Sequence, residues 1–130
     1  MKAVDTNVLL RHIVQDDPAQ SAKASTFLTE RTVEDPAFVS LIVVAELTSA
    51  LKQRYRYSRE QIQFLFTALL ETAELVFEEE QFLTTLIDGK HGGDIADHLI
   101  AFSATRAGCT STMTFDRRAA KSISSMEFLA

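Results

Sequence analysis

Cysteine, proline, glycine and tryptophan are scarce in this chain, and their scarcity excludes several classes of protein. Among the 130 residues there are one Cys, two Pro, four Gly and no Trp. The lone Cys109 cannot form an intramolecular disulfide or a thiolate pair for zinc, so we expect it to be a small buried residue. So few Gly and Pro residues argue against long disordered tails.

Long apolar runs are also missing. None reaches the length of a membrane span, and the N-terminus meets the acidic Asp5 before any hydrophobic region of the signal-peptide kind. We therefore expect a cytoplasmic protein without a membrane partner. The length suits a single domain over residues 1–130, which would bury roughly two-thirds of its unfolded surface.

The net charge of −5 at first argues against a nucleic-acid partner, because phosphate backbones are normally met by a surplus of Lys and Arg. The basic residues nevertheless gather in two places. Each group is explained either as a solvated helix end or as a surface that guides an RNA backbone. The first basic cluster consists of Lys52, Arg54, Arg56 and Arg59, and the second consists of Arg117, Arg118 and Lys121.

Apolar periodicity and capping residues predict short strands that alternate with helices. We expect strands at 3–4, 37–39, 75–77, 110–113 and 126–129. Helices are expected directly after Asp5, over 19–31, 41–55, 58–74 and 80–87, and from 94 to a C-cap near Gly108. This alternation indicates βαβ units, and hence an α/β fold with a mostly parallel sheet of four to five strands.

The segment Asp5-Thr6-Asn7 lies between the first strand and the first helix. Ligands of open α/β sheets bind beyond the carboxyl ends of the strands, where this corner would lie. Asp5 is therefore a candidate functional acid. The plainer reading, which the residues alone leave open, is that Asp5 only caps a helix.

Glu46 is the only charged residue in the stretch from Phe38 to Leu51. A carboxylate on so apolar a helix must either face solvent or be compensated, because the burial of a bare charge is very costly. We interpret Glu46 as a functional acid, with a satisfied or interfacial Glu as the alternative.

Three further acids lie at helix starts or strand ends. Asp94 and Asp97 are about one helical turn apart, and the helix dipole explains Asp94 as a cap more easily than it explains Asp97. Asp116 follows a strand as Asp5 does, although a turn or N-cap role before Arg117 would also account for it.

Parallel strands would bring Asp5 and Asp116 to one edge of the sheet, together with the starts of the helices that carry Glu46 and Asp97. Four carboxylates at one place repel each other, and a divalent cation removes that repulsion. All-oxygen ligands suit Mg²⁺ or Mn²⁺, and no Cys/His set for zinc is present. Such an ion activates water and stabilises charge on an attacked phosphate, which predicts phosphodiester cleavage.

Five segments resemble PIN-domain ribonucleases, especially the VapC toxins of bacterial toxin-antitoxin pairs. Four of them correspond, in order and approximate spacing, to the acidic motifs of the family, and the fifth follows the first helix. The segments are Asp5–Arg11, Val43–Leu47, Asp94–Ala101, Thr114–Asp116 and, as the fifth, Gln15–Ala22.

The resemblance implies a three-layer α/β/α fold with a central parallel sheet, and a Mg²⁺- or Mn²⁺-dependent endonuclease that cleaves RNA such as tRNA or rRNA. For VapC-like toxins it also implies a homodimer that is silenced by a cognate VapB antitoxin. The antitoxin inserts a C-terminal segment near the active site and carries the DNA-binding part of the complex, so the toxin meets DNA only indirectly.

The resemblance also assigns roles by position. It implies that the catalytic acids are Asp5, Glu46, Asp97 and Asp116, that Asp5, Asp97 and Asp116 hold the metal, and that Thr6, Asn7, Asp94 and Thr114 support the site or contact substrate. The clearest departure from the family pattern is His98, where a small residue is common. A contact with substrate and a structural role are both open for this side chain.

Two other functions compete with this interpretation. A haloacid-dehalogenase-like phosphatase also places an Asp after its first strand, but it requires a second Asp two residues later, where this chain has Asn7. A non-catalytic RNA-binding module of the same fold is the other alternative. Four acids argue against it, because a surface that binds phosphates gains nothing from them.

Overall fold

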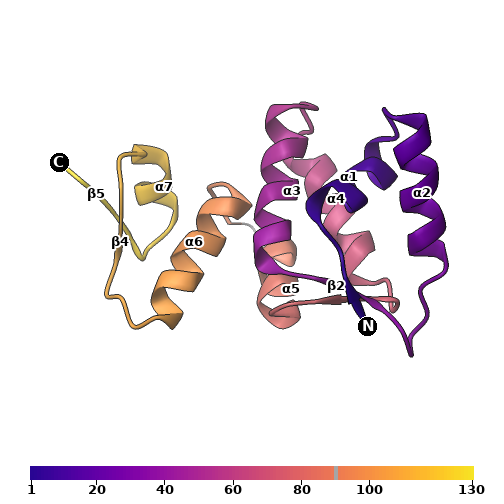
Figure 1. The fold of residues 1–130 in the computed structure, drawn as a ribbon. Coiled ribbons are helices and arrows are strands. Elements are labelled where there is room, and N and C mark those ends of the chain that lie inside the picture. The colour runs from indigo at the N-terminus through magenta and orange to yellow at the C-terminus, as the bar shows by residue number, and fades with distance from the viewer. Residues whose placement is uncertain (90) are drawn as a thin grey trace. The chain divides into compact units, whose positions relative to one another are not determined.

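The computed structural model describes residues 1–89 and 91–130, so Lys90, which lies in the Gly-rich segment 89–93 of the sequence, is outside the described residues. The described chain forms two compact units, Met1–Asp88 (unit 1) and Gly89–Ala130 (unit 2). Figure 1 shows the helices and strands of both. Unit 1 contains, in order, β1 (Lys2–Ala3), α1 (Thr6–Val14), α2 (Pro18–Thr29), β2 (Ala37–Val39), α3 (Leu41–Gln53), α4 (Arg59–Leu70), β3 (Leu75–Phe77) and α5 (Glu80–Asp88).

The three strands of unit 1 form a parallel sheet in the order β1-β2-β3. Ala3 pairs with Phe38, and Phe38 pairs with Val76. The backbone N–H of Val4 continues this pairing by donating to the carbonyl of Phe38 at 3.0 Å. Because the strands are parallel, the residues that follow them emerge at the same edge of the sheet, and Asp5 is one of these.

The helices of unit 1 pack against one another through the apolar faces that their sequences predict. In unit 1, α1 contacts both α2 and α3, and α4 contacts α3 and α5. Leu10, Val44, Leu47 and Leu51 are completely buried between them. Each such side chain contributes about 1.5 to 3 kcal/mol by leaving water, so α1 and α3 hold each other firmly in place.

Two predicted helix starts are confirmed in detail. The carboxylate of Asp17 accepts from the backbone N–H of Gln20 at 3.1 Å, and Pro18 occupies the first helical position. Ser58 and Gln61 form a complete capping box at the start of α4. The prediction for the end of α4 is wrong, since the helix stops at Leu70 and not near Glu74.

Unit 2 contains α6 (Ile95–Arg106), β4 (Thr112–Thr114), α7 (Arg117–Ser122) and β5 (Met126–Phe128). The two strands pair in parallel, with Thr112 opposite Met126. The core of this unit consists of Ala101, Ala119, Ile123 and Met126. The sequence interpretation did not include α7, whose six residues are too few to show an apolar period.

The expectation for Cys109 is wrong, because its side chain is exposed. Gly108, with φ of 95°, ends α6 in the left-handed conformation that glycine adopts most easily. The next N–H, that of Cys109, returns to the carbonyl of Ala104 at 3.0 Å. This turn leads the chain away from the helix and leaves the thiol at the surface.

The predicted fold class is confirmed. Helices alternate with five strands in the described chain, and every strand pair is parallel, which is consistent with a three-layer α/β/α fold. None of the described helices combines the length and the apolar character that crossing a bilayer requires.

Candidate functional site

Asp5 lies at the carboxyl end of β1, as its sequence position predicts. It is the N-cap of α1, and its Oδ1 accepts from the backbone N–H of Thr6 at 2.7 Å. The residue is exposed, and its second oxygen makes no hydrogen bond with another described residue. Asp5 therefore caps a helix and still presents an oxygen to a ligand, so the two readings of this residue do not exclude each other.

Thr6 connects Asp5 to a second candidate acid, Glu46 of α3. The Oγ1 hydroxyl of Thr6 donates to Oε1 of Glu46 at 2.7 Å. Thr6 is only 9% exposed, whereas Glu46 is exposed and keeps its other oxygen without a hydrogen bond to the described chain. One fixed threonine thus holds carboxylates that are 41 residues apart in sequence (46 minus 5), which accounts for the one charged residue in the apolar stretch from Phe38 to Leu51.

Asn7 follows in the first turn of α1 and is exposed. It lines a pocket of about 580 Å³, together with Asp5. The Asn7 amide makes no hydrogen bond with another described side chain, so both its donor and its acceptor face solvent or the pocket.

In unit 2, Asp116 repeats the arrangement of Asp5. It follows β4 and caps α7, where its Oδ1 accepts from the backbone N–H groups of Arg118 at 2.9 Å and Ala119 at 3.1 Å. The hydroxyl of Thr114 accepts from the N–H of Asp116 at 3.0 Å. These bonds fix the exposed carboxylate of Asp116 at the strand end and give Thr114 a supporting role.

Asp94 and Asp97 lie at the start of α6. Asp94 is the N-cap residue, although its side chain makes no capping hydrogen bond, and Asp97 is half-buried in the first turn. The neighbouring His98 has its Nε2 2.6 Å from the carbonyl of Gly92, and its ring lies edge-on to that of His91. The bond to the backbone favours a structural role for His98, because it ties the preceding loop to α6.

The chemistry of these side chains fits a hard divalent cation. Asp5, Glu46 and Asp116 each use one oxygen for a hydrogen bond within the protein and keep the other for a ligand, and all-oxygen donor sets suit Mg²⁺ or Mn²⁺. Over residues 1–89 and 91–130, no group of three or more His, Cys, Asp or Glu side chains is assembled as a metal site. Unit 1 carries two of the four acids and unit 2 carries the other two, and their convergence on one ion stays a prediction.

A polar network beside Asn7 was not anticipated from the sequence. The Nη1 of Arg11 donates to Asp16 at 2.9 Å and lies 3.5 Å from the hydroxyl of Tyr55, and that hydroxyl donates to Asp16 at 2.7 Å. The bond to Tyr55 is the main cause that raises the pKa of Arg11 and lowers the pKa of Asp16. Arg11 and Asp16 lie in segments of the family resemblance, but nothing in the sequence marks Tyr55 as their partner.

Comparison with known families supports the resemblance. The family model described as PIN domain matches residues 2–123, which is most of the chain. Proteins with this domain are generally nucleases that use divalent metal ions. No curated protein matches the chain.

Proposed function

Because the chain belongs to the PIN-domain family, we propose that it is a metal-dependent endoribonuclease and the toxin of a VapBC-type toxin-antitoxin pair. The observation that carries the nuclease assignment is the Asp5-Thr6-Glu46 arrangement at the carboxyl end of β1. One buried residue holds two exposed carboxylates, and each of them keeps an oxygen that the described chain does not use and that can bind a cation. The family match also favours this function over the phosphatase alternative.

The acids divide into two roles in this proposal. Asp5, Asp97 and Asp116 hold Mg²⁺ or Mn²⁺, and Glu46 accepts a proton from the attacking water and helps to orient it. The ion, when bound, lowers the pKa of coordinated water and stabilises the charge that develops on the scissile phosphate. Thr6 orients Glu46 through its hydroxyl, Thr114 supports Asp116, and Asp94 begins the helix that carries Asp97.

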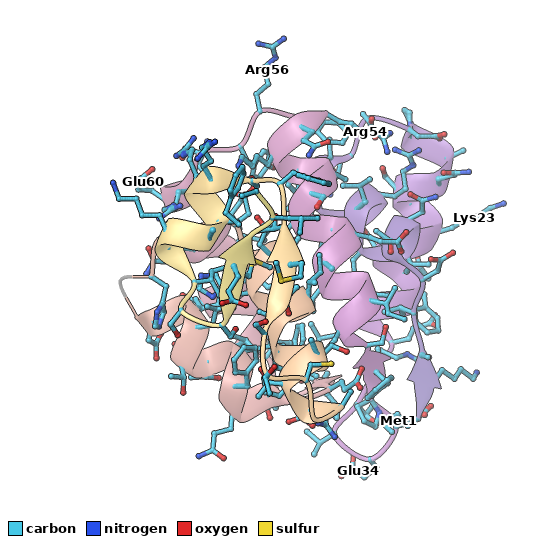
Figure 2. All side chains as sticks on the ribbon, turned by 90° about the vertical axis from the view of Figure 1, so that its left-hand side faces the viewer. Met1, Lys23, Glu34, Arg54, Arg56 and Glu60 are labelled. Carbon is cyan, nitrogen blue, oxygen red and sulfur yellow. The ribbon has the colours of Figure 1, made fainter. Side chains whose placement is uncertain are left out.

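The two basic clusters are the surfaces expected to meet the RNA backbone. In the first basic cluster, Lys52 and Arg54 end α3, Arg56 follows in the loop, and Arg59 begins α4. All four residues are exposed, and Figure 2 shows the Arg56 side chain projecting away from the ribbon. Such a concentration of positive charge offsets the net charge of −5 locally and lets an acidic protein approach phosphates.

The toxin assignment extends to the substrate and the partners. We expect tRNA or rRNA as the substrate, a VapB-type antitoxin as the silencing partner, and contact with DNA only through that antitoxin. A homodimer is expected through α3 and α4. Ile42 on α3 is 73% exposed and Phe64 on α4 is 79% exposed, and such apolar surface is typical of a contact with another protein. Sedimentation at micromolar concentration tests this contact, and a wild-type monomer would exclude it.

The nuclease proposal is tested with a pair of matched substitutions. Asp5 and Asp17 both cap helices of unit 1, and asparagine caps a helix about as well as aspartate. Asp5→Asn should therefore keep the fold and lower Mg²⁺-dependent RNA cleavage by at least about 100-fold, because one charged metal ligand is lost. Asp17→Asn should leave cleavage unchanged.

Growth arrest after induction gives a second readout of the same pair. The Asp17→Asn variant should arrest growth as the wild type does, and the Asp5→Asn variant should not. Undiminished cleavage and arrest by Asp5→Asn would refute the assignment. RNA binding by the wild type without any cleavage would instead favour the non-catalytic RNA-binding module.

A further inference from the structure

The pocket next to Asp5 has mainly apolar walls. Its volume of about 580 Å³ lies within the range of sites that hold small organic groups. The walls come from β1, α1 and α2, and they include Val4, Val8, Ala24 and Phe27. The guanidinium of Arg31 lies 4.2 Å from the centre of the Phe27 ring and covers one of its faces. Phe27 is thereby held in place, with its remaining surface available to a flat ligand.

The polar residues that line the pocket include two amides, Asn7 and Gln20. The Nε of Arg11 donates to Oε1 of Gln20 at 2.9 Å, and a guanidinium can only donate. The Gln20 oxygen must therefore face Arg11, and its NH₂ group is left as an oriented donor. Amides of Asn and Gln offer a donor and an acceptor side by side, which is the pattern that complements the edge of a nucleobase.

The pocket also carries a positive charge that the protein does not neutralise. The charge of Arg11 is paired with Asp16 at 2.9 Å, but Lys23 forms no ion pair with any described residue. Lys23 is exposed, and Figure 2 shows its side chain extending away from α2. An ammonium in this position, in a protein with a net charge of −5, is suited to a phosphate.

We propose that this pocket binds one unpaired nucleotide of the RNA beside the bond that is cleaved. The base lies in the apolar part of the pocket, against Phe27. The amides of Asn7 and Gln20 contact the edge of the base, and Lys23 contacts the phosphate. The inference rests on the proposed function, because Asp5 borders the same pocket. A peptide segment would also find apolar walls here, but two base-reading amides together with an unpaired cation favour a nucleotide.

The test measures RNA binding without catalysis. A fluorescein-labelled single-stranded RNA of mixed sequence is titrated with protein in EDTA, and anisotropy gives the affinity. Gln20→Glu keeps an oxygen for Arg11 but replaces the NH₂ donor by a carboxylate, so it should weaken binding about tenfold or more. Lys23→Gln should weaken binding about threefold to tenfold and lower the salt dependence by about 0.7 in log–log slope.

The control is Lys2→Gln, which removes the same charge from an exposed position in β1, before Ala3 and Val4. It should change the affinity less than about twofold. Nuclear magnetic resonance of the ¹⁵N-labelled protein locates the contact, and the amide signals of Ala24 and Phe27 should shift when the RNA is added. Circular dichroism confirms that all three variants are folded.

Two results of the binding experiments would overturn the inference. In one, Gln20→Glu and Lys23→Gln bind RNA as the wild type does. In the other, RNA leaves the signals of Ala24 and Phe27 unmoved, which would assign the pocket to another occupant such as a peptide. Failure of the proposed function is seen separately, as absence of Mg²⁺-dependent cleavage by the wild type. If Gln20→Glu and Lys23→Gln cleave RNA as the wild type does, the nucleotide-binding role of the pocket is refuted and the proposed nuclease function is not.

Discussion

The hydrogen bond from Thr6 to Glu46 allows the positioning of a catalytic group to be separated from the stability of the fold. Thr6→Val removes the hydroxyl and keeps the β-branched shape of this nearly buried side chain. A hydrogen bond to a charged group contributes about 1.5 to 3 kcal/mol when its loss leaves a partner unsatisfied. Glu46 is exposed, however, so water replaces the lost donor, and we expect the free energy of unfolding to change by less than about 1 kcal/mol.

The effect on catalysis should be larger than the effect on stability. Without the bond at 2.7 Å, the Glu46 carboxylate is free to leave its position, and a misplaced catalytic group lowers rates by up to about 100-fold. We expect kcat for RNA cleavage to fall between about 10-fold and 100-fold, with little change in KM.

Thr6→Ser is the matched control, because it keeps the hydroxyl and loses one buried methyl group. It should lose about 0.8 kcal/mol of stability, which is comparable with the change in Thr6→Val, and retain most of the activity, so the two variants should be separated by kcat and not by urea denaturation. Wild-type kcat in Thr6→Val, or equal losses of kcat in both variants, would refute the positioning role of Thr6.

Three further predictions concern the surroundings of the site. Ser58→Ala removes the capping box of α4 and should lower the free energy of unfolding by about 1 kcal/mol in urea denaturation. Tyr55→Phe removes the main cause of the lowered pKa of Asp16, so that pKa, followed by nuclear magnetic resonance, should rise toward its ordinary value. The lowered pKa of Asp16 stabilises the folded protein at pH values above the unfolded-state pKa. This stabilisation is lost as the pH falls through the folded-state pKa. Because Tyr55→Phe has less of it to lose, its free energy of unfolding should fall less on acidification than that of the wild type. Arg56→Glu should weaken RNA cleavage and reduce its salt dependence, whereas Lys2→Glu should do neither, and equal effects of the two would remove the first basic cluster from the RNA path.

Local signals in the sequence predicted most of the elements correctly. Asp17-Pro18 and the Ser58-Gln61 pair mark helix starts through contacts within three residues, so their chemistry is visible in the sequence. The corner at Asp5 was predicted for the same reason, since a short apolar strand gives way to capping residues.

The features that sequence reasoning missed depend on contacts distant in the chain or on very short elements. The Tyr55 hydroxyl donates to Asp16, which is 39 residues away in sequence, and no local sequence pattern predicts that hydrogen bond. The helix α7 is too short for a period, although the capping bonds of Asp116 now explain why it forms. Cys109 was expected in the core from its residue type, but the turn after Gly108 places it at the surface.

The most direct test of the central claim is a titration of the ¹⁵N-labelled protein with Mn²⁺. The unpaired electrons of this ion broaden the amide signals of nearby residues. If the four acids hold one ion, substoichiometric Mn²⁺ should broaden the signals around Asp5, Glu46, Asp97 and Asp116 together, and an excess of Mg²⁺ should restore them. Broadening confined to the acids of one unit, or broadening that Asp5→Asn leaves unchanged, would contradict a shared metal centre.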